Sequence, residues 1–220
     1  MSLNVKTAPK AGRNRVNQPT LEPATYPARV AQIIDFGVQP QRPYKGKDKP
    51  PAHEISLSYE LLDTFMVDEN GKELEDKPRW ISETFALRNI DADLAKSTKR
   101  YMALDPNMDA GGDFTRLIGT PCLVTVAVNS VGDKVYENVS AVTPMRAKEA
   151  EKAVELKNTP RVFTLDDPDM KVWETFPDWI KKKIKENLEF RGSKLEIALV
   201  DSIDADEQSD GDDESTDEDW

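Results

Sequence analysis

Four cations and one aromatic ring fall within a short stretch of the chain, between positions 42 and 49. The members of this set are Arg42, Tyr44, Lys45, Lys47 and Lys49. Lysine and arginine bind phosphate oxygens, and an exposed aromatic face offers a base a surface on which to stack. The set is therefore typical of a surface that binds a single nucleic-acid strand. The alternative is a solvated turn in which the Tyr44 ring packs against the protein.

Two predicted strands flank this set. In residues 25–38, apolar side chains recur at even positions, namely Tyr26, Ala28, Val30, Ile34 and Phe36. In residues 53–63, apolar and polar side chains alternate in the same way. A period of two residues indicates a half-buried strand. Because residues 39–51 contain four prolines, they are predicted to form the loop between these strands.

A third strand is predicted over residues 79–89, with Ile81, Phe85 and Leu87 on one face and Trp80 on the other. Trp80 is therefore a candidate for base stacking, and the alternative is an indole covered by the C-terminal helix. Further candidates for DNA binding flank the same sheet or lie on a later strand, and they are Arg29, Arg79, Arg88 and Tyr136.

The predicted order of elements is three strands, a helix and two strands. The helix covers residues 91–105 with Asp91 as its cap, and the last two strands cover residues 121–128 and 133–142. This is the order of a five-stranded oligonucleotide/oligosaccharide-binding (OB) barrel, in which we expect the helix between strands three and four. The predicted fold class is mainly β with α+β elements, as a single OB-fold domain over residues 23–145.

A helical extension is predicted over residues 146–200, packed on the barrel. Its clearest element is an amphipathic helix at residues 176–190, whose apolar stripe is Trp179, Ile180, Ile184 and Leu188. The same helix carries a group of lysines, namely Lys181, Lys182, Lys183 and Lys185. These lysines form either a solvated face or a further surface that follows phosphates.

The two ends of the chain have opposite charge. Residues 1–22 are rich in cations and are predicted to form a basic flexible arm. Residues 201–220 carry 11 acids and no cation; since the whole chain has a net charge of −11, the rest of it is neutral overall. A segment of such charge repels itself and buries little surface, which predicts a disordered tail.

Several kinds of chemistry are not indicated by the sequence. One cysteine and one histidine supply neither a disulfide nor a Cys/His metal cluster, and there is no Gly-rich phosphate loop or HExxH motif. We therefore expect no catalytic residue, no metal and no cofactor. No apolar run reaches the ~18 residues of a membrane span and no signal peptide is evident, so we expect no membrane partner.

A family resemblance is carried by five separate segments: TLEPATYPARVAQIIDFGVQPQRPYKGKDKPPAHEISLSYELLD, DKPRWISE, STKRYMALDP, GGDFTRLIGTPCLVTV and KVYENVSAV. Over about residues 20–200, the chain resembles the single-stranded DNA-binding proteins of tailed bacteriophages. The resemblance implies an OB fold, binding to single-stranded DNA without sequence preference, and a role in DNA replication, recombination or repair in the host cytoplasm. Binding to duplex DNA or to RNA stays open.

The acidic terminus also resembles the C-terminal peptide of bacterial and phage single-stranded DNA-binding proteins, which ends in an aromatic residue. The resemblance implies that Asp217, Glu218, Asp219 and Trp220 bind replication proteins such as a polymerase or a helicase–primase. This chain departs from the usual pattern because it ends in Trp220 where the family usually has Phe. The alternative is a tail that only keeps the protein soluble.

Two other functions remain open on the sequence. The first is a protein-interaction adaptor with an OB body, for which binding to nucleic acid is secondary. The second is a nuclease, in which clustered acids such as those of DENGKELED would converge on a metal.

Overall fold

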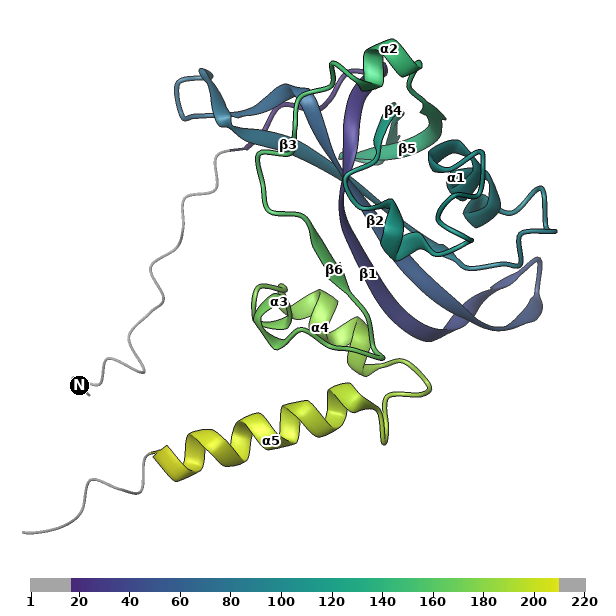
Figure 1. The fold of residues 1–220 in the computed structure, drawn as a ribbon, viewed down its shortest axis with the longest axis vertical. Coiled ribbons are helices and arrows are strands. Elements are labelled where there is room, and N and C mark those ends of the chain that lie inside the picture. Colours follow the sequence, from purple (N-terminus) through teal and green to yellow (C-terminus); the bar gives the residue numbers. More distant parts are fainter. Residues whose placement is uncertain (1–16, 210–220) are drawn as a thin grey trace, which may run out of the picture.

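Long β-strands dominate the structure, a computed structural model that describes residues 17–209 (Figure 1). The strands are β1 (Thr25–Tyr44), β2 (Lys47–Val67), β3 (Glu73–Ala86), β4 (Pro121–Val131), β5 (Lys134–Pro144) and β6 (Arg161–Phe163). The helices are α1 (Lys96–Leu104), the 3-10 helix η2 (Phe114–Leu117), α2 (Ala147–Ala150), α3 (Met170–Glu174), α4 (Asp178–Lys185) and α5 (Lys194–Ser209). The sheet is antiparallel in the order β3-β2-β1-β4-β5, and β6 pairs with β1 in parallel.

The sheet is open between β3 and β5, where a closed five-stranded barrel was predicted. No ladder of backbone hydrogen bonds joins these two strands within the described residues. Side chains bridge the gap instead. Arg79 of β3 forms an ion pair with Glu137 of β5 at 3.1 Å, and Arg100 of α1 donates to the carbonyls of Val139 and Ser140. The helix between the third and fourth strands is present, as predicted.

A β-bulge in β1 changes which side chains face the core. Val30 pairs with Tyr59 and Gln32 pairs with Ser58, so Ala31 is an extra residue in the strand. Before the bulge, Val30 faces the main core, and after it Ile34 faces a second core. The predicted single phase from Tyr26 to Phe36 is therefore wrong, because one inserted residue exchanges the two faces of a strand.

Two apolar cores lie on opposite sides of β1. The main core is enclosed by the strands, α1 and η2, and includes Ile55, Leu57, Tyr59 and Leu61 of β2, as the alternation predicts. The second core joins Ile34 and Phe36 to buried side chains of the C-terminal part, namely Phe163, Trp173, Phe176, Ile180, Ile184 and Leu195. Residues 161–199 are thus packed on the outer face of β1 (Figure 1).

Several predicted helix boundaries are corrected. Helix α1 begins at Lys96 after Ala95, so Asp91 does not cap it. Helix α4 ends at Lys185, so Leu188 lies beyond it. Of the predicted apolar stripe, Ile180 and Ile184 are buried, whereas Trp179 and Leu188 are exposed. The predicted helical extension over residues 146–200 also contains a strand, β6, which was not predicted from the sequence. No helix within the described residues is long and apolar enough to cross a bilayer.

Both predicted flexible ends contain ordered residues. Residues 17–22 were assigned to the arm, but the Gln18 side-chain amide bonds to both backbone groups of Val67, and Leu21 is buried. At the other end, α5 continues to Ser209, inside the predicted tail. The rest of the arm, residues 1–16, and the rest of the tail, residues 210–220, lie outside the described residues.

Cys122 is buried in β4, and we expect it to resist modification in the folded protein. Burial raises the pKa of the Cys122 thiol to about 12, so almost no reactive thiolate is present near neutral pH. A thiol-specific chromogenic reagent should label the native chain very slowly and the chain in concentrated urea completely. Rapid labelling of the native chain would show that β4 opens readily.

Candidate nucleic-acid interface

Residues 42–49, here called the basic hairpin, form the tip of a two-stranded ribbon that extends away from the rest of the sheet (Figure 1). Tyr44 pairs with Lys47 around a two-residue turn, in which Lys45 and Gly46 both have positive φ. Such turns match the twist of antiparallel strands. The predicted loop over residues 39–51 is therefore wrong. Prolines are compatible with this ribbon because each of its two strands has a free edge.

The Tyr44 ring is exposed on the basic hairpin and does not pack against the protein. Its side chain is 58% exposed. The ammonium groups of Lys45 and Lys49 lie 5.4 and 4.8 Å from the centre of the ring. This arrangement excludes the alternative in which Tyr44 is packed down, and it leaves an aromatic face beside positive charge.

The four cations of the basic hairpin carry no ion pair within the described residues. All four side chains are exposed, and they are Arg42, Lys45, Lys47 and Lys49. Asp48 is the one acid in this stretch, and since no described carboxylate forms an ion pair with the four cations, their charge is available to an anionic partner. The structure therefore brings five predicted DNA-binding residues together on one ribbon.

Helix α4 supports the root of the basic hairpin. Lys183 forms an ion pair with Glu54 at 2.7 Å, and the Gln41 amide donates to the same carboxylate at 2.7 Å. A polar groove of about 350 Å³ lies here, lined in part by Arg42 and Lys49. Lys183 thus belongs to the surroundings of the hairpin. The group of lysines on its helix was the signal in the sequence, but nothing there distinguished Lys183 from its neighbours.

Arg29 and Arg79 are not part of this interface. Arg29 is buried and donates to the carbonyls of Gly119 and Val154, both at 2.8 Å. Arg79 is buried as well, and it joins the Pro19 carbonyl to the Glu137 carboxylate. A guanidinium with five donors can tie several segments together. Both arginines do this, and they are not exposed to bind phosphate.

Trp80 lies on the face opposite Ile81, as predicted, but its indole is held by a buried acid. The indole N–H donates to Glu60 at 3.0 Å. The same carboxylate accepts from the backbone N–H of Lys157 and the side-chain amide of Asn158. Trp80 is half-buried beside the segment that follows α2, and not beneath the C-terminal helix. The structure does not bring it to the basic hairpin.

The remaining two candidates, Arg88 and Tyr136, are exposed but occupy different places. Tyr136 lies on β5, 46% exposed. Thr25, the first residue of β1, pairs with Thr125 of the antiparallel strand β4, so the rest of β4 and the β4–β5 turn extend past the start of β1. Tyr44 is the last residue of β1 and lies at its opposite end. Tyr136 is therefore separate from the basic hairpin. Arg88 follows β3 and lies at the edge of a pocket.

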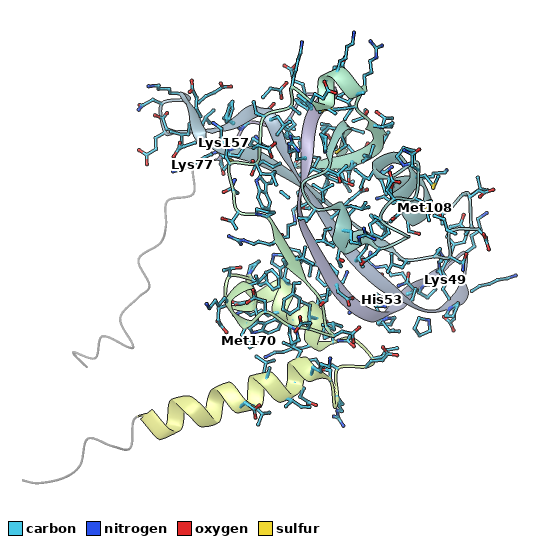
Figure 2. All side chains as sticks on the ribbon, in the orientation of Figure 1. Lys49, His53, Lys77, Met108, Lys157 and Met170 are labelled. Carbon is cyan, nitrogen blue, oxygen red and sulfur yellow. The ribbon has the colours of Figure 1, made fainter. Side chains whose placement is uncertain are left out.

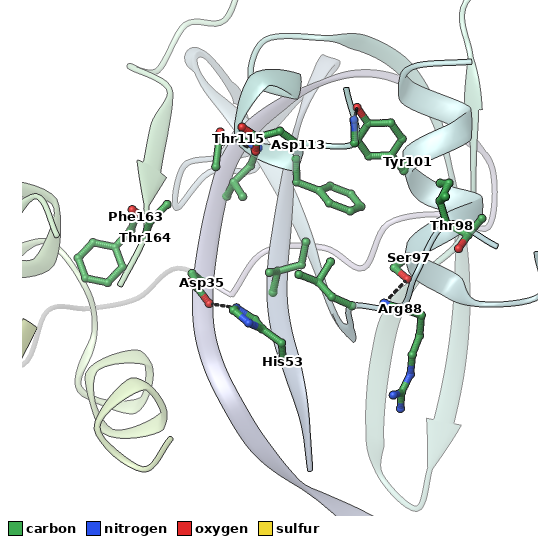
Figure 3. Close-up of a pocket in the computed structure, with 16 residues that line it drawn as sticks. Asp35, His53, Arg88, Ser97, Thr98, Tyr101, Asp113, Thr115, Phe163 and Thr164 are labelled. Atoms are coloured by element: carbon green, nitrogen blue, oxygen red, sulfur yellow. Dashed lines mark hydrogen bonds and ion pairs between the residues drawn. The ribbon is translucent and has the colours of Figure 1, made fainter. Parts of the chain in front are cut away.

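This pocket, here called the α1 pocket, is a cavity of about 340 Å³ between β1, β2, α1, the segment before η2, and β6 (Figure 3). Its floor is apolar and includes Ile33, Ile55 and Phe114. At its edge, His53 bonds to the Asp35 carboxylate at 2.5 Å. This hydrogen bond raises the pKa of His53, although partial burial of the ring opposes the shift.

The His53–Asp35 pair predicts a pH-dependent stability. Asp35 favours protonated His53 in the folded state, so its contribution is complete below about pH 6.5 and is lost as the pH rises through the raised folded-state pKa. The urea midpoint should therefore fall between about pH 6 and pH 8. The chain has no other histidine, so a His53→Gln variant should show a flatter profile. If the urea midpoint of the His53→Gln variant falls with pH as steeply as that of the natural chain, another group causes the pH dependence.

The last two predictions concern the acidic tail and the clustered acids that could bind a metal ion. Asp217, Glu218, Asp219 and Trp220 lie outside the described residues. Within the described part of the chain, no three His, Cys, Asp or Glu side chains come together as they would around a metal ion.

Comparison of the sequence with known protein families and with curated proteins gives no match.

Proposed function

We propose that this protein binds single-stranded DNA without sequence preference. One observation carries the proposal: on the basic hairpin, an exposed Tyr44 ring lies among four cations that have no ion pair within the described residues. Binding to single strands combines positive charge for the backbone with aromatic rings for the bases. Neither contact depends on which base is present, because every base has a face that can stack.

The strand order supports an OB-type barrel as the platform for this hairpin. Strand β1 pairs with both β2 and β4, and α1 lies between β3 and β4. The Arg79–Glu137 ion pair joins β3 to β5 across the open edge. In OB folds, the loop between the first two strands is one of the loops that bind oligonucleotides. The basic hairpin occupies this position.

A two-stranded ribbon can also enter the major groove of duplex DNA, so the experiment must compare the two forms. We would titrate a fluorescent oligo-dT and a matched duplex with the full-length chain over a series of salt concentrations. The proposal expects tighter binding to the single strand and an affinity that falls as salt rises, because phosphate contacts release counterions. Equal or tighter binding to the duplex, or no binding at low salt, would contradict it.

The acidic tail fits the same function as a site for replication proteins. A segment with 11 acids resembles a nucleic-acid backbone in charge, and Trp220 supplies an apolar anchor. A chain that ends at Ser209 keeps α5 and removes the rest of the tail. It should still bind oligo-dT but should no longer retain a replicative polymerase or helicase–primase on a column.

A further inference from the structure

We infer that the α1 pocket is a binding site for a single nucleobase. The inference rests on the proposed function in one respect, since the base would come from the strand held by the basic hairpin. Its own basis is the shape, lining and position of the pocket.

The pocket lies on the path that leads away from the basic hairpin. Lys49 and His53 follow each other along β2, four residues apart, which is about 13 Å in a strand (Figure 2). His53 and Arg88 lie at the same side of the cavity (Figure 3). A strand whose phosphates contact the hairpin would therefore pass His53, which is paired with Asp35, and reach the exposed cation of Arg88 at the edge of the pocket.

Arg88 is suited to hold a phosphate at this edge. Its backbone N–H donates to the Ser97 hydroxyl at 3.0 Å, which fixes the residue against α1. Its side chain is exposed and has no ion pair or hydrogen bond to any residue that the structure describes. This is the environment that Arg29 and Arg79 lack, because both use their guanidinium groups within the protein.

The interior of the pocket suits a flat ring with polar edges. Ile33, Ile55 and Phe114 offer apolar surface to the faces of a ring. On the wall, the Ser97 hydroxyl accepts from Arg88 and keeps its own proton to donate. Asp113 uses only Oδ1, for Thr115, so its other oxygen is free to accept within the described residues. Unstacked bases are bound in this way, by apolar contact with their faces and hydrogen bonds to their edges.

The volume of the pocket also agrees with a small ligand. At about 340 Å³, it falls at the lower end of the range for small-molecule sites. Its accessible surface is mostly apolar, as in such sites generally, while polar side chains make up about half of its lining residues. A base entering it would leave the neighbouring nucleotides on the surface, beside His53 and Arg88.

The test uses the full-length, isotope-labelled chain and amide chemical shifts. Three probes are compared: thymidine, deoxyribose 5-phosphate and an oligo-dT. Thymidine should shift the amides of Ser97, Thr98 and Thr115 in a saturable way, whereas the sugar phosphate, which has no base, should not. An absence of thymidine shifts, or equal shifts with the sugar phosphate, would overturn the inference.

Two variants of one loop provide a matched pair. Ile90 lines the mouth of the pocket and is 38% exposed, whereas Leu94 is 86% exposed and does not line it. Ile90→Trp should block the pocket and abolish the thymidine shifts, and Leu94→Trp should retain them. If Ile90→Trp retains them, the ligand binds elsewhere and the inference fails.

The oligo-dT separates this inference from the proposed function. If the oligomer shifts the amides of the basic hairpin but leaves the pocket unchanged, the base site is overturned while single-strand binding stands. If thymidine occupies the pocket but the oligomer does not affect Tyr44 or Lys47, the nucleobase site is supported and the proposed role of the hairpin fails.

Discussion

A Glu83→Ala substitution should lower the free energy of unfolding by about 3–5 kcal/mol, the cost of breaking a buried ion pair by removing one partner. Glu83 is a buried carboxylate of β3. It accepts from Nε of Arg100 at 2.7 Å and from the Tyr59 hydroxyl at 2.8 Å, and Lys96 lies 2.8 Å away. Its loss would leave the Arg100 guanidinium charged, buried and without its carboxylate.

The measurement is urea denaturation followed by tryptophan fluorescence at neutral pH. Glu73→Ala is the control, because Glu73 is an exposed acid on the same strand, and such surface substitutions usually change stability by less than about 0.5 kcal/mol. A double variant with Arg100→Met should recover part of the loss, since it removes the unpaired charge. If Glu83→Ala is no less stable than Glu73→Ala, the ion pair between Glu83 and Arg100 does not hold α1 on the sheet.

The buried Glu83 illustrates what the sequence could and could not predict about the fold. Alternation predicted the central parts of β2 and β3, and it placed position 83 in the same phase as Ile81 and Phe85. The bounds were wrong, because β2 extends beyond residues 53–63 at both ends and β3 begins at Glu73 and ends at Ala86. It could not show that a carboxylate in this phase meets Arg100, because that contact depends on how α1 docks. The bulge at Ala31 was missed for a similar reason: an extra residue in β1 is defined only by the pairing with β2.

The candidate site was predictable where its residues are contiguous. Tyr44 and the neighbouring cations form one cluster in the chain, so any local structure keeps them together. Arg29 and Arg79 were predicted from strand phase alone, which does not reveal the carbonyls that they bind. The α1 pocket could not be predicted at all, because its lining comes from segments as distant as β1 and β6.

Loss of the basic hairpin charge should change both the affinity for single-stranded DNA and its salt dependence. For single strands, each phosphate contact contributes about 0.7 to the slope of log affinity against log salt. A triple variant, with Lys45, Lys47 and Lys49 each replaced by Gln, should therefore lower the magnitude of the slope by about 2. The control replaces Lys72 and Lys134, which are exposed near the other two hairpin turns, and should leave the slope unchanged.

Tyr44→Ala should weaken binding without changing the salt slope, because stacking is not ionic. Removing a stacking ring costs about 1–3 kcal/mol, which is roughly a 5- to 150-fold loss of affinity. Tyr44→Phe keeps the ring and should bind like the natural chain. The two variants together separate stacking from charge. If Tyr44→Phe also loses affinity for single-stranded DNA, the contact depends on the hydroxyl and not on the ring. If Tyr44→Ala keeps its full affinity, the hairpin binds DNA through charge alone.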